Sequence, residues 1–247
     1  MTSDPPSASL AAAKSASAGT IIGTVRPQPR QLPGDQSAAG GAYDSSKFKF
    51  APKVNPAELR NFVVYVDGVT STNFTAPYAP ILVETRARRV NQEGAVFSPH
   101  VLPVLVGTTV EWPNNDTIYH NVFSLSEAAS FDLGLYKNGD EAQRVKFDKP
   151  GRVDVFCSIH ANMNCVILVL ENPYFSGTDG RNNYLIRDVP AGVYKLKVWH
   201  ERWPSQIKEV TVPETGQVKV DFTPGWDEAT TGTTNSAPPA TTNSPAK

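Results

Sequence analysis

The 247-residue sequence predicts an all-β fold, and three of its features lead to this prediction. Apolar and polar residues alternate with a period of two in short segments; in Tyr194–His200 the apolar side chains and the two lysines point to opposite sides. Turn signals such as Pro150-Gly151 and Thr215-Gly216 separate these segments. No window has the apolar spacing of a long amphipathic helix, and only Ser126–Ser130 is expected to form a single helical turn.

Each predicted strand has a local justification. The early ones are apolar runs that end at turn residues, as in NFVVYVDG, which spans residues 61–68. Alternation across residues 152–157 places Cys157 on the inward face of its strand, and the run CVILVL that follows indicates a buried strand. The last strands alternate again. In chain order, we expect strands at Thr20–Arg26, Phe62–Asp67, Ile81–Thr85, Val101–Val106, Thr109–Trp112, His120–Ser124, Arg144–Phe147, Val153–Cys157, Cys165–Leu170, Tyr184–Arg187, Tyr194–His200, Ile207–Val212 and Gln217–Phe222.

Composition and charge exclude several classes of protein. The formal net charge of −1 gives no electrostatic reason to bind nucleic acid or an anionic membrane. No segment is long and apolar enough to span a bilayer, and the amino-terminal residues lack the apolar core of a signal peptide. Residues 1–18 and 225–247 are poor in large hydrophobic side chains, so we expect disordered tails there, and Pro27–Ser46 has the same character.

The segment FCSIHANMNC, residues 156–165, carries the strongest chemical signal. It places a thiol at Cys157, an imidazole at His160 and a thioether at Met163, directly after a predicted strand. A second imidazole, His120, begins another predicted strand upstream. One Cys, two His and one Met are the ligand set of a mononuclear blue-copper site, because thiolate and thioether suit Cu(I) while imidazole suits both oxidation states. We therefore predict that His120, Cys157, His160 and Met163 bind one copper ion.

Other uses of these residues remain open. Cys157 and Cys165 are the two cysteines of the chain and could form a disulfide, or could join His120 and His160 in a zinc site. Both alternatives leave Met163 without a role, and the zinc spacing fits no common finger. We expect Cys165 to be a free, buried core residue. The remaining histidines, His100 and His200, lie in no ligand pattern and are expected to be structural.

The ligand spacing resembles that of the cupredoxin family, over roughly Gln92 to Pro173. Met163 follows Cys157 by six positions, as in short-loop members such as amicyanin, and Asn115-Asp116 precedes His120-Asn121 as in the family. The resemblance implies a Greek-key β-sandwich over residues 78–173, with Asn121 tying the His120 strand to the Cys157 loop. It also implies that electrons pass through the exposed edge of His160, beside Ala161. Cys165 departs from the family pattern.

A second resemblance concerns the segments on either side of this unit. The turn Asp188–Tyr194, DVPAGVY, resembles the x-V-P-x-G-x-Y turn of the carboxypeptidase regulatory-like, transthyretin-type sandwich. The strands that usually begin such a module occur far upstream, as GTIIGTV and NFVVYVDG. We therefore expect this sandwich to be split between residues 19–75 and 174–224, with the cupredoxin unit inserted in it. Alternatively, the early strands extend the cupredoxin sheet. Some bacterial plastocyanin-like and methylamine-utilisation-type proteins combine the two units.

The function implied by these resemblances is electron transport. We expect an exported, periplasmic or cell-surface blue-copper protein that passes single electrons between redox protein partners. We expect it to have no membrane span, although it could belong to a membrane-associated assembly. An alternative is a structural or adhesive β-sandwich protein whose copper site stores metal. A copper oxidase or nitrite-reductase-like enzyme is disfavoured, because such enzymes need further His clusters and the chain has four histidines in all. No other catalytic motif is present, so we predict a carrier and not an enzyme.

Overall fold

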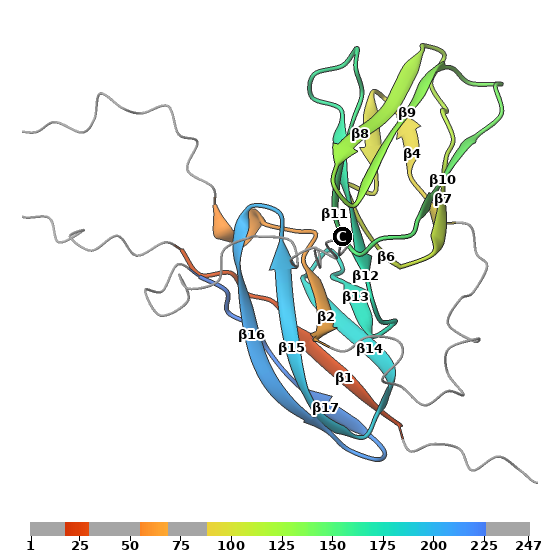
Figure 1. The fold of residues 1–247 in the computed structure, drawn as a ribbon. Helices are drawn as coiled ribbons and strands as arrows, with labels where there is room; N and C mark the ends of the chain where they lie inside the picture. The colour runs from red at the N-terminus through yellow and green to blue at the C-terminus, as the bar shows by residue number, and fades with distance from the viewer. Residues whose placement is uncertain (1–17, 30–54, 69–87, 226–247) are drawn as a thin grey trace, which may run out of the picture.

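The computed structural model describes residues 18–29, 55–68 and 88–225, and these are almost entirely β-strand (Figure 1). The prediction of an all-β fold is confirmed. The described part has one short 3-10 helix, η2 (Pro56–Glu58), capped by the Asn55 side chain, which accepts from the Ala57 N–H. The predicted strand Ile81–Thr85 and nearly all of the predicted disordered tails lie outside the described residues. Ala18, assigned to the amino-terminal tail, instead begins strand β1.

Residues 88–172 form a sandwich that we call the middle sandwich. One sheet has the strand order β6-β12-β11-β8-β9 and the other the order β10-β7-β3, with a small β4-β5 hairpin beside them. Their apolar faces share one core, which includes Val110, Trp112, Phe147, Val155 and Ile167. The strands are β3 (Arg88–Arg89), β4 (Asn91–Glu93), β5 (Val96–Ser98), β6 (Val101–Leu105), β7 (Thr108–Trp112), β8 (His120–Ser126), β9 (Ala129–Tyr136), β10 (Gln143–Phe147), β11 (Gly151–Phe156) and β12 (Asn164–Leu170).

The segments before and after residues 88–172 pair with each other, and we call them the flanking sandwich. Its two sheets have the orders β14-β1-β17 and β13-β2-β15-β16, around a separate core. Strand β1 pairs antiparallel with β14 and parallel with β17, and β2 pairs with β13 and β15. The strands are β1 (Ala18–Thr24), β2 (Val63–Asp67), β13 (Phe175–Gly177), β14 (Asn183–Pro190), β15 (Gly192–His200), β16 (Trp203–Val212) and β17 (Gln217–Lys219). The assignment of this unit to the regulatory-like family remains a prediction.

The two sandwiches contact each other through the outer face of β12. Val166, Leu168 and Leu170 pack in one buried cluster with Val63 of β2, and Trp199 of β15 packs against that cluster. Side chains on the opposite face of β12 belong to the core of the middle sandwich. This explains why the run CVILVL is apolar throughout: the strand has a core on each side. Strand β12, which leads directly out of the predicted ligand loop, is therefore fixed by both units.

The predicted secondary structure differs from the observed one in one helical turn and in several missed strands. Ser126–Ser130 was expected to be a helical turn, and this is wrong: β8 and β9 are joined at Glu127–Ala128 by a two-residue turn. Strand β9 was missed. The alternation of Ala129, Phe131, Leu133 and Leu135 is present in β9; Phe131 and Leu133 pack against the core, and Leu135 is exposed. The short strands β3, β4, β5 and β13 were missed as well, because two or three residues carry no period.

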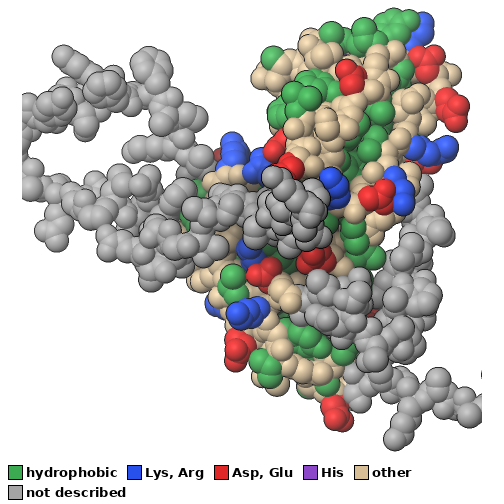
Figure 2. Space-filling view, in the orientation of Figure 1, with side chains coloured by type: hydrophobic (Ala, Val, Ile, Leu, Met, Phe, Trp, Pro, Cys, Tyr) green, Lys and Arg blue, Asp and Glu red, His purple; other side chains and the backbone are tan. Residues whose placement is uncertain are grey.

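Figure 2 shows charged side chains of both signs interspersed over the visible face of the molecule, without a large patch of one sign. This agrees with the formal net charge of −1. Among the described residues, no helix has the length and hydrophobicity needed to cross a membrane.

Candidate metal centre

Three of the four predicted ligands converge at one end of the middle sandwich. His120 is the first residue of β8, Cys157 follows the last residue of β11, and His160 lies in the loop between β11 and β12. Their donor atoms all lie within 4.8 Å of one another. In the described part of the chain, these three residues are the cluster of His, Cys, Asp or Glu side chains with the geometry to hold a metal ion, and we call them the metal-capable group. The two Nδ1 atoms are 3.1 Å apart, and His160 Nδ1 is 3.5 Å from Cys157 Sγ.

The loop that carries three of these residues is closed by its own backbone. The Cys157 N–H donates to the Met163 carbonyl at 3.1 Å, and the Met163 N–H donates to the His160 carbonyl at 3.0 Å. Phe156 and Asn164 form the pair of the β11–β12 ladder next to the loop. The Met163 side chain is buried in the same core cluster as Cys157. These hydrogen bonds between the ends of two core strands thus fix the backbone of the loop that carries Cys157, His160 and Met163.

Burial differs among the four side chains. His120 is fully buried and Met163 is 1% exposed, while Cys157 is 6% exposed. His160 is half-buried and is the member of the group that reaches the surface. Water is therefore excluded from three of the side chains, and one imidazole edge remains accessible to a partner.

A carboxylate orients His120. Asp116 Oδ2 lies 2.7 Å from His120 Nε2. Because a carboxylate only accepts, the imidazole must carry its proton on Nε2, which leaves the Nδ1 lone pair directed at the other two donors. Asp116 also accepts from two backbone N–H groups, Ala95 at 2.9 Å and Gly94 at 2.7 Å. The hydrogen bond from Ala95 is the main reason that the pKa of Asp116 lies below its usual range.

The turn that presents these two N–H groups depends on unusual backbone angles. Gly94 and Ala95 link β4 to β5, and both have positive φ values, +64° and +56°. Two successive residues of this kind form the tight turn preferred between antiparallel strands. The sequence predicted an Asn-Asp turn before His120 but not the role of Asp116. The missing information was the position of the β4–β5 hairpin, which lies about twenty residues upstream.

Asn114 organises the segment that carries Asp116. Its Oδ1 accepts from the Asp116 N–H at 2.8 Å, and its Nδ2 donates to the carbonyls of Ile118 and Tyr136. The segment is thereby attached to β9. Asn114 was not singled out from the sequence, although an Asn two residues before an Asp is a common turn former.

Asn121 supports the thiol, but not quite as expected. Its backbone N–H donates to Cys157 Sγ at 3.5 Å, which ties β8 to the loop. Its side-chain Nδ2 instead reaches β9, where it donates to Asp132 Oδ1 at 2.6 Å. Within the described residues, the buried Oδ1 of Asn121 has no hydrogen-bond partner.

The other predictions about cysteine and histidine can be compared with the structure. Both cysteines are free and buried, and burial raises the pKa of the Cys165 thiol. Cys165 is not a member of the metal-capable group, nor are His100 and His200. The ring of His200 packs on Phe62 in the flanking sandwich, and His100 bonds to Glu201.

The donor set fits copper. A cysteine sulfur, two imidazoles and the thioether of Met163, which lies in the same core cluster as Cys157, are soft and intermediate ligands that both copper oxidation states accept. The separations of 3.1 and 3.5 Å are compatible with donors that each lie roughly 2.0–2.3 Å from a shared ion.

Residues 85–170 match the family of copper binding proteins of the plastocyanin/azurin type. The matched segment contains all four predicted ligands. It covers the middle sandwich and not the flanking one. Together with the His120–Cys157–His160 group, this match supports copper as the cofactor and a cupredoxin-type copper-binding domain in this part of the chain. No curated protein matches the chain.

Several solved structures are similar to part of the chain. A copper-containing nitrite reductase from Thermus scotoductus SA-01 has 32% identity and a TM-score of 0.33, over 35% of this chain and 23% of that one. A purple cupredoxin from Nitrosopumilus maritimus has 26% identity and a TM-score of 0.30, over 34% of this chain and 99% of that one. A reduced amicyanin variant has 25% identity and a TM-score of 0.32, over 34% and 82%. The chain thus spans about a quarter of the nitrite reductase.

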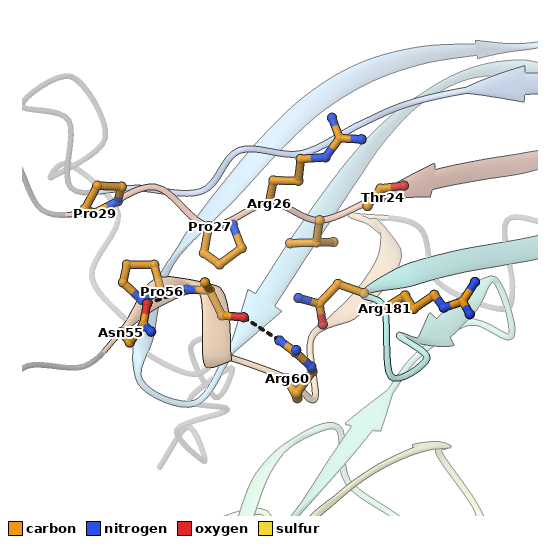
Figure 3. Close-up of a pocket in the computed structure, with 11 residues that line it drawn as sticks. Thr24, Arg26, Pro27, Pro29, Asn55, Pro56, Arg60 and Arg181 are labelled. Atoms are coloured by element: carbon orange, nitrogen blue, oxygen red, sulfur yellow. Dashed lines mark hydrogen bonds between the residues drawn. The ribbon is translucent and has the colours of Figure 1, made fainter.

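A surface pocket of ≈ 560 Å³ lies elsewhere, in the flanking sandwich (Figure 3). Its lining includes Arg26, Arg60, Arg181 and three prolines, and none of the four predicted ligands. Arg60 already donates to the carbonyls of Ala57 and Leu59, so its guanidinium stabilises the local backbone. The pocket therefore suggests no reaction or ligand, and the metal-capable group remains the candidate functional site.

Proposed function

We propose that this protein is a single-electron carrier with one copper ion held by His120, Cys157 and His160, and more weakly by Met163. The observation that supports it most is the convergence of two Nδ1 atoms and one Sγ within 4.8 Å at a buried sandwich end. Copper bound there supplies a one-electron couple between Cu(I) and Cu(II).

The protein side of this function is the fixed arrangement of the donors. Asp116 keeps the proton of His120 on Nε2, and the Asn121 N–H directs Cys157 Sγ by a hydrogen bond. The backbone bonds of the loop hold Met163 and His160 in place. Little of this scaffold has to move when the charge of the site changes by one, and a small rearrangement favours fast electron exchange.

His160 is the proposed point of electron entry and exit. It is half-buried, and its neighbours Ile159 and Ala161 are exposed; Ile159 is 50% exposed. Ile118 and Tyr119, directly before His120, are each 49% exposed. We propose that these apolar side chains dock a redox protein partner through a small interface, as is usual for transient redox encounters. Neither nucleic acid nor a membrane span is part of the proposal.

The wider setting is also a proposal. We infer an exported protein that acts in the periplasm or at the cell surface, where copper carriers of the matched family type commonly work. The flanking sandwich, proposed as a split regulatory-like unit of residues 19–75 and 174–224, would connect the copper-binding unit of residues 78–173 to a larger assembly. Its described part contains no metal-capable group of its own.

Copper titration followed by visible spectroscopy and electrochemistry tests the function. We expect one copper per chain, strong visible absorption from the thiolate–Cu(II) bond, and a reversible one-electron wave. A colourless protein that binds copper without reversible reduction would favour the storage alternative. Turnover of nitrite or dioxygen by the loaded protein would contradict the carrier and favour an enzyme.

A further inference from the structure

His100 joins the flanking sandwich to the end of the ligand loop. Its Nε2 lies 2.8 Å from Glu201 Oε1, in the turn between β15 and β16. Its Nδ1 lies 3.2 Å from the carbonyl oxygen of Asn164, the residue that follows Met163. Copper chemistry makes no direct use of His100. Its ring nevertheless bridges the two sandwiches at a point one residue from a proposed ligand.

The partners of His100 determine its protonation. A carboxylate oxygen and a backbone carbonyl oxygen are both acceptors. A neutral imidazole has one N–H, so it can satisfy only one of them and must turn a nitrogen lone pair towards the other oxygen. Both contacts are satisfied together only when His100 is an imidazolium with two N–H groups. The geometry is thus that of a charged histidine between two oxygens.

Both ends of this bridge are held firmly. The Val166 N–H donates to the His100 carbonyl at 2.8 Å, so the backbone of His100 is attached to β12 as well. On the other side, Arg152 of β11 donates to the Glu201 carbonyl at 3.3 Å and lies over the Trp199 ring at 5.9 Å. One side chain, that of His100, therefore connects Glu201 to Asn164.

Asn164 is linked in turn to the copper ligands. It pairs with Phe156 across the β11–β12 ladder, and its neighbour Met163 accepts from the Cys157 N–H. A contact that fixes the Asn164 carbonyl fixes the peptide group between Asn164 and Cys165, and with it the direction in which the chain leaves Met163.

We propose that His100 is a positioning residue through which the flanking sandwich, by way of Glu201, holds the Met163 end of the copper loop in place. Both contacts exist when His100 is charged. When the ring loses a proton, the remaining N–H stays with the Glu201 carboxylate, the stronger acceptor, and the contact with Asn164 is released. The copper site then responds to pH through a residue that is not a ligand. The expected influence on copper rests on the proposed function; the bridge itself does not.

The charged groups around His100 are mixed in sign. Glu201 is the acidic neighbour, and its hydrogen bond is the main reason that the pKa of His100 is raised. Arg202, in the same turn, opposes this increase, and burial of the ring opposes it as well. The charge of His100 contributes to lowering the pKa of His200 on β15, and Arg152 donates a hydrogen bond to the Glu201 carbonyl. Of the two charged side chains that shift the pKa of His100 most clearly, removing the Glu201 charge leaves Arg202, and this favours the neutral ring.

The test compares four forms of the full chain: wild type, His100→Gln, Glu201→Gln and the control Glu209→Gln, which removes an exposed carboxylate on β16. In copper-loaded protein we expect the reduction potential and the visible spectrum of the wild type to change together in a one-proton step. His100→Gln should lose this step, Glu201→Gln should shift it to lower pH, and Glu209→Gln should leave it unchanged. An identical pH profile in wild type and His100→Gln would overturn the proposal.

A copper-free measurement separates this proposal from the proposed function. Nitrogen NMR of the metal-free wild type should show both ring nitrogens of His100 protonated at low pH. The intrinsic rate of amide exchange rises with pH, so the readout is the protection factor of the Cys157 amide, whose N–H donates to the Met163 carbonyl. This protection factor should fall as the ring deprotonates, and should be low at all pH values in His100→Gln. If these results hold but copper gives no visible band, the electron-carrier function fails and the bridge stands. If the protection factor of the Cys157 amide changes neither with pH nor in His100→Gln, the proposal that His100 positions the loop fails, whatever the result with copper.

Discussion

Replacing Asp116 by Asn is the sharpest perturbation of the proposed copper site that leaves all four ligands unchanged. The wild-type carboxylate receives three donors: the Gly94 and Ala95 N–H groups and His120 Nε2–H. An Asn amide offers one oxygen and one NH₂, so at least one of these donors faces another donor. The charge that supports His120 is lost as well.

The magnitude follows from these contacts. Mutation of a residue that hydrogen-bonds a metal-bound His typically lowers metal affinity about 10- to 100-fold. The Asn oxygen can take the place of Oδ2 and keep the contacts with Ala95 and His120, so the donor that loses its acceptor is the exposed Gly94 N–H. The net value of one hydrogen bond is about 0.5–1.5 kcal/mol. We therefore expect Asp116→Asn to weaken copper binding within that range of affinity and to destabilise the metal-free protein by about 0.5–1.5 kcal/mol.

The assay is copper competition with a chelator, together with urea unfolding of the metal-free protein. Asp148→Asn is the matched control, because Asp148 is an exposed carboxylate of the same sandwich and pairs with Lys146 on the surface. The control should change affinity and stability very little. A folded Asp116→Asn protein with wild-type copper affinity would refute the argument that this carboxylate orients His120.

Three further predictions concern the cysteines and pH. Cys157→Ser should abolish the visible absorption of the Cu(II) form while far-UV circular dichroism stays unchanged; a variant as coloured as the wild type would exclude Cys157 as a ligand. Cys165→Ala should keep the colour and cost about 1 kcal/mol of stability, and thiol titration of the unfolded metal-free wild type should find two free thiols rather than a disulfide. The His100–Glu201 pair should stabilise the fold most between pH 4.5 and 6.5, the ordinary pKa values of Glu and His. The raised pKa of His100 makes its contribution disappear as pH rises through that pKa, and the lowered pKa of Glu201 makes its contribution disappear as pH falls through it. Urea unfolding of the metal-free wild type and Glu201→Gln across pH checks this, and a pH-independent difference would contradict it.

Many of the strands were predictable because their sequences show a local hydrophobic periodicity. Strands β11 and β15 have alternating sequences and β12 is almost wholly apolar, and their predicted bounds differ from the structure by a few residues. The element predicted at Ser126–Ser130 failed because a two-residue hairpin turn and a short helical turn look alike in sequence. The pairing of β1 with β14 and β17 needed a long-range argument, since these strands lie more than 150 residues apart.

Three of the predicted ligands, His120, Cys157 and His160, lie together in the structure, and their assignment as copper ligands stays a prediction; the residues that contact them were not predicted. Cys157, His160 and Met163 lie on one short loop, so their chemistry is visible as a motif. Asp116 and His100 make contacts with residues that are distant in the sequence and that the fold brings near. Asp116 accepts hydrogen bonds from Gly94 and Ala95, and His100 contacts Glu201. No spacing rule connects such residues, so sequence alone treats them as ordinary turn or surface positions.

Anomalous diffraction from crystals of the copper-loaded chain, at the copper absorption edge, tests the central claim most directly. The account predicts one strong peak bonded to the Nδ1 atoms of His120 and His160 and to Cys157 Sγ, with Met163 as the more distant neighbour. A peak located elsewhere, or one bonded to Cys165, would contradict it.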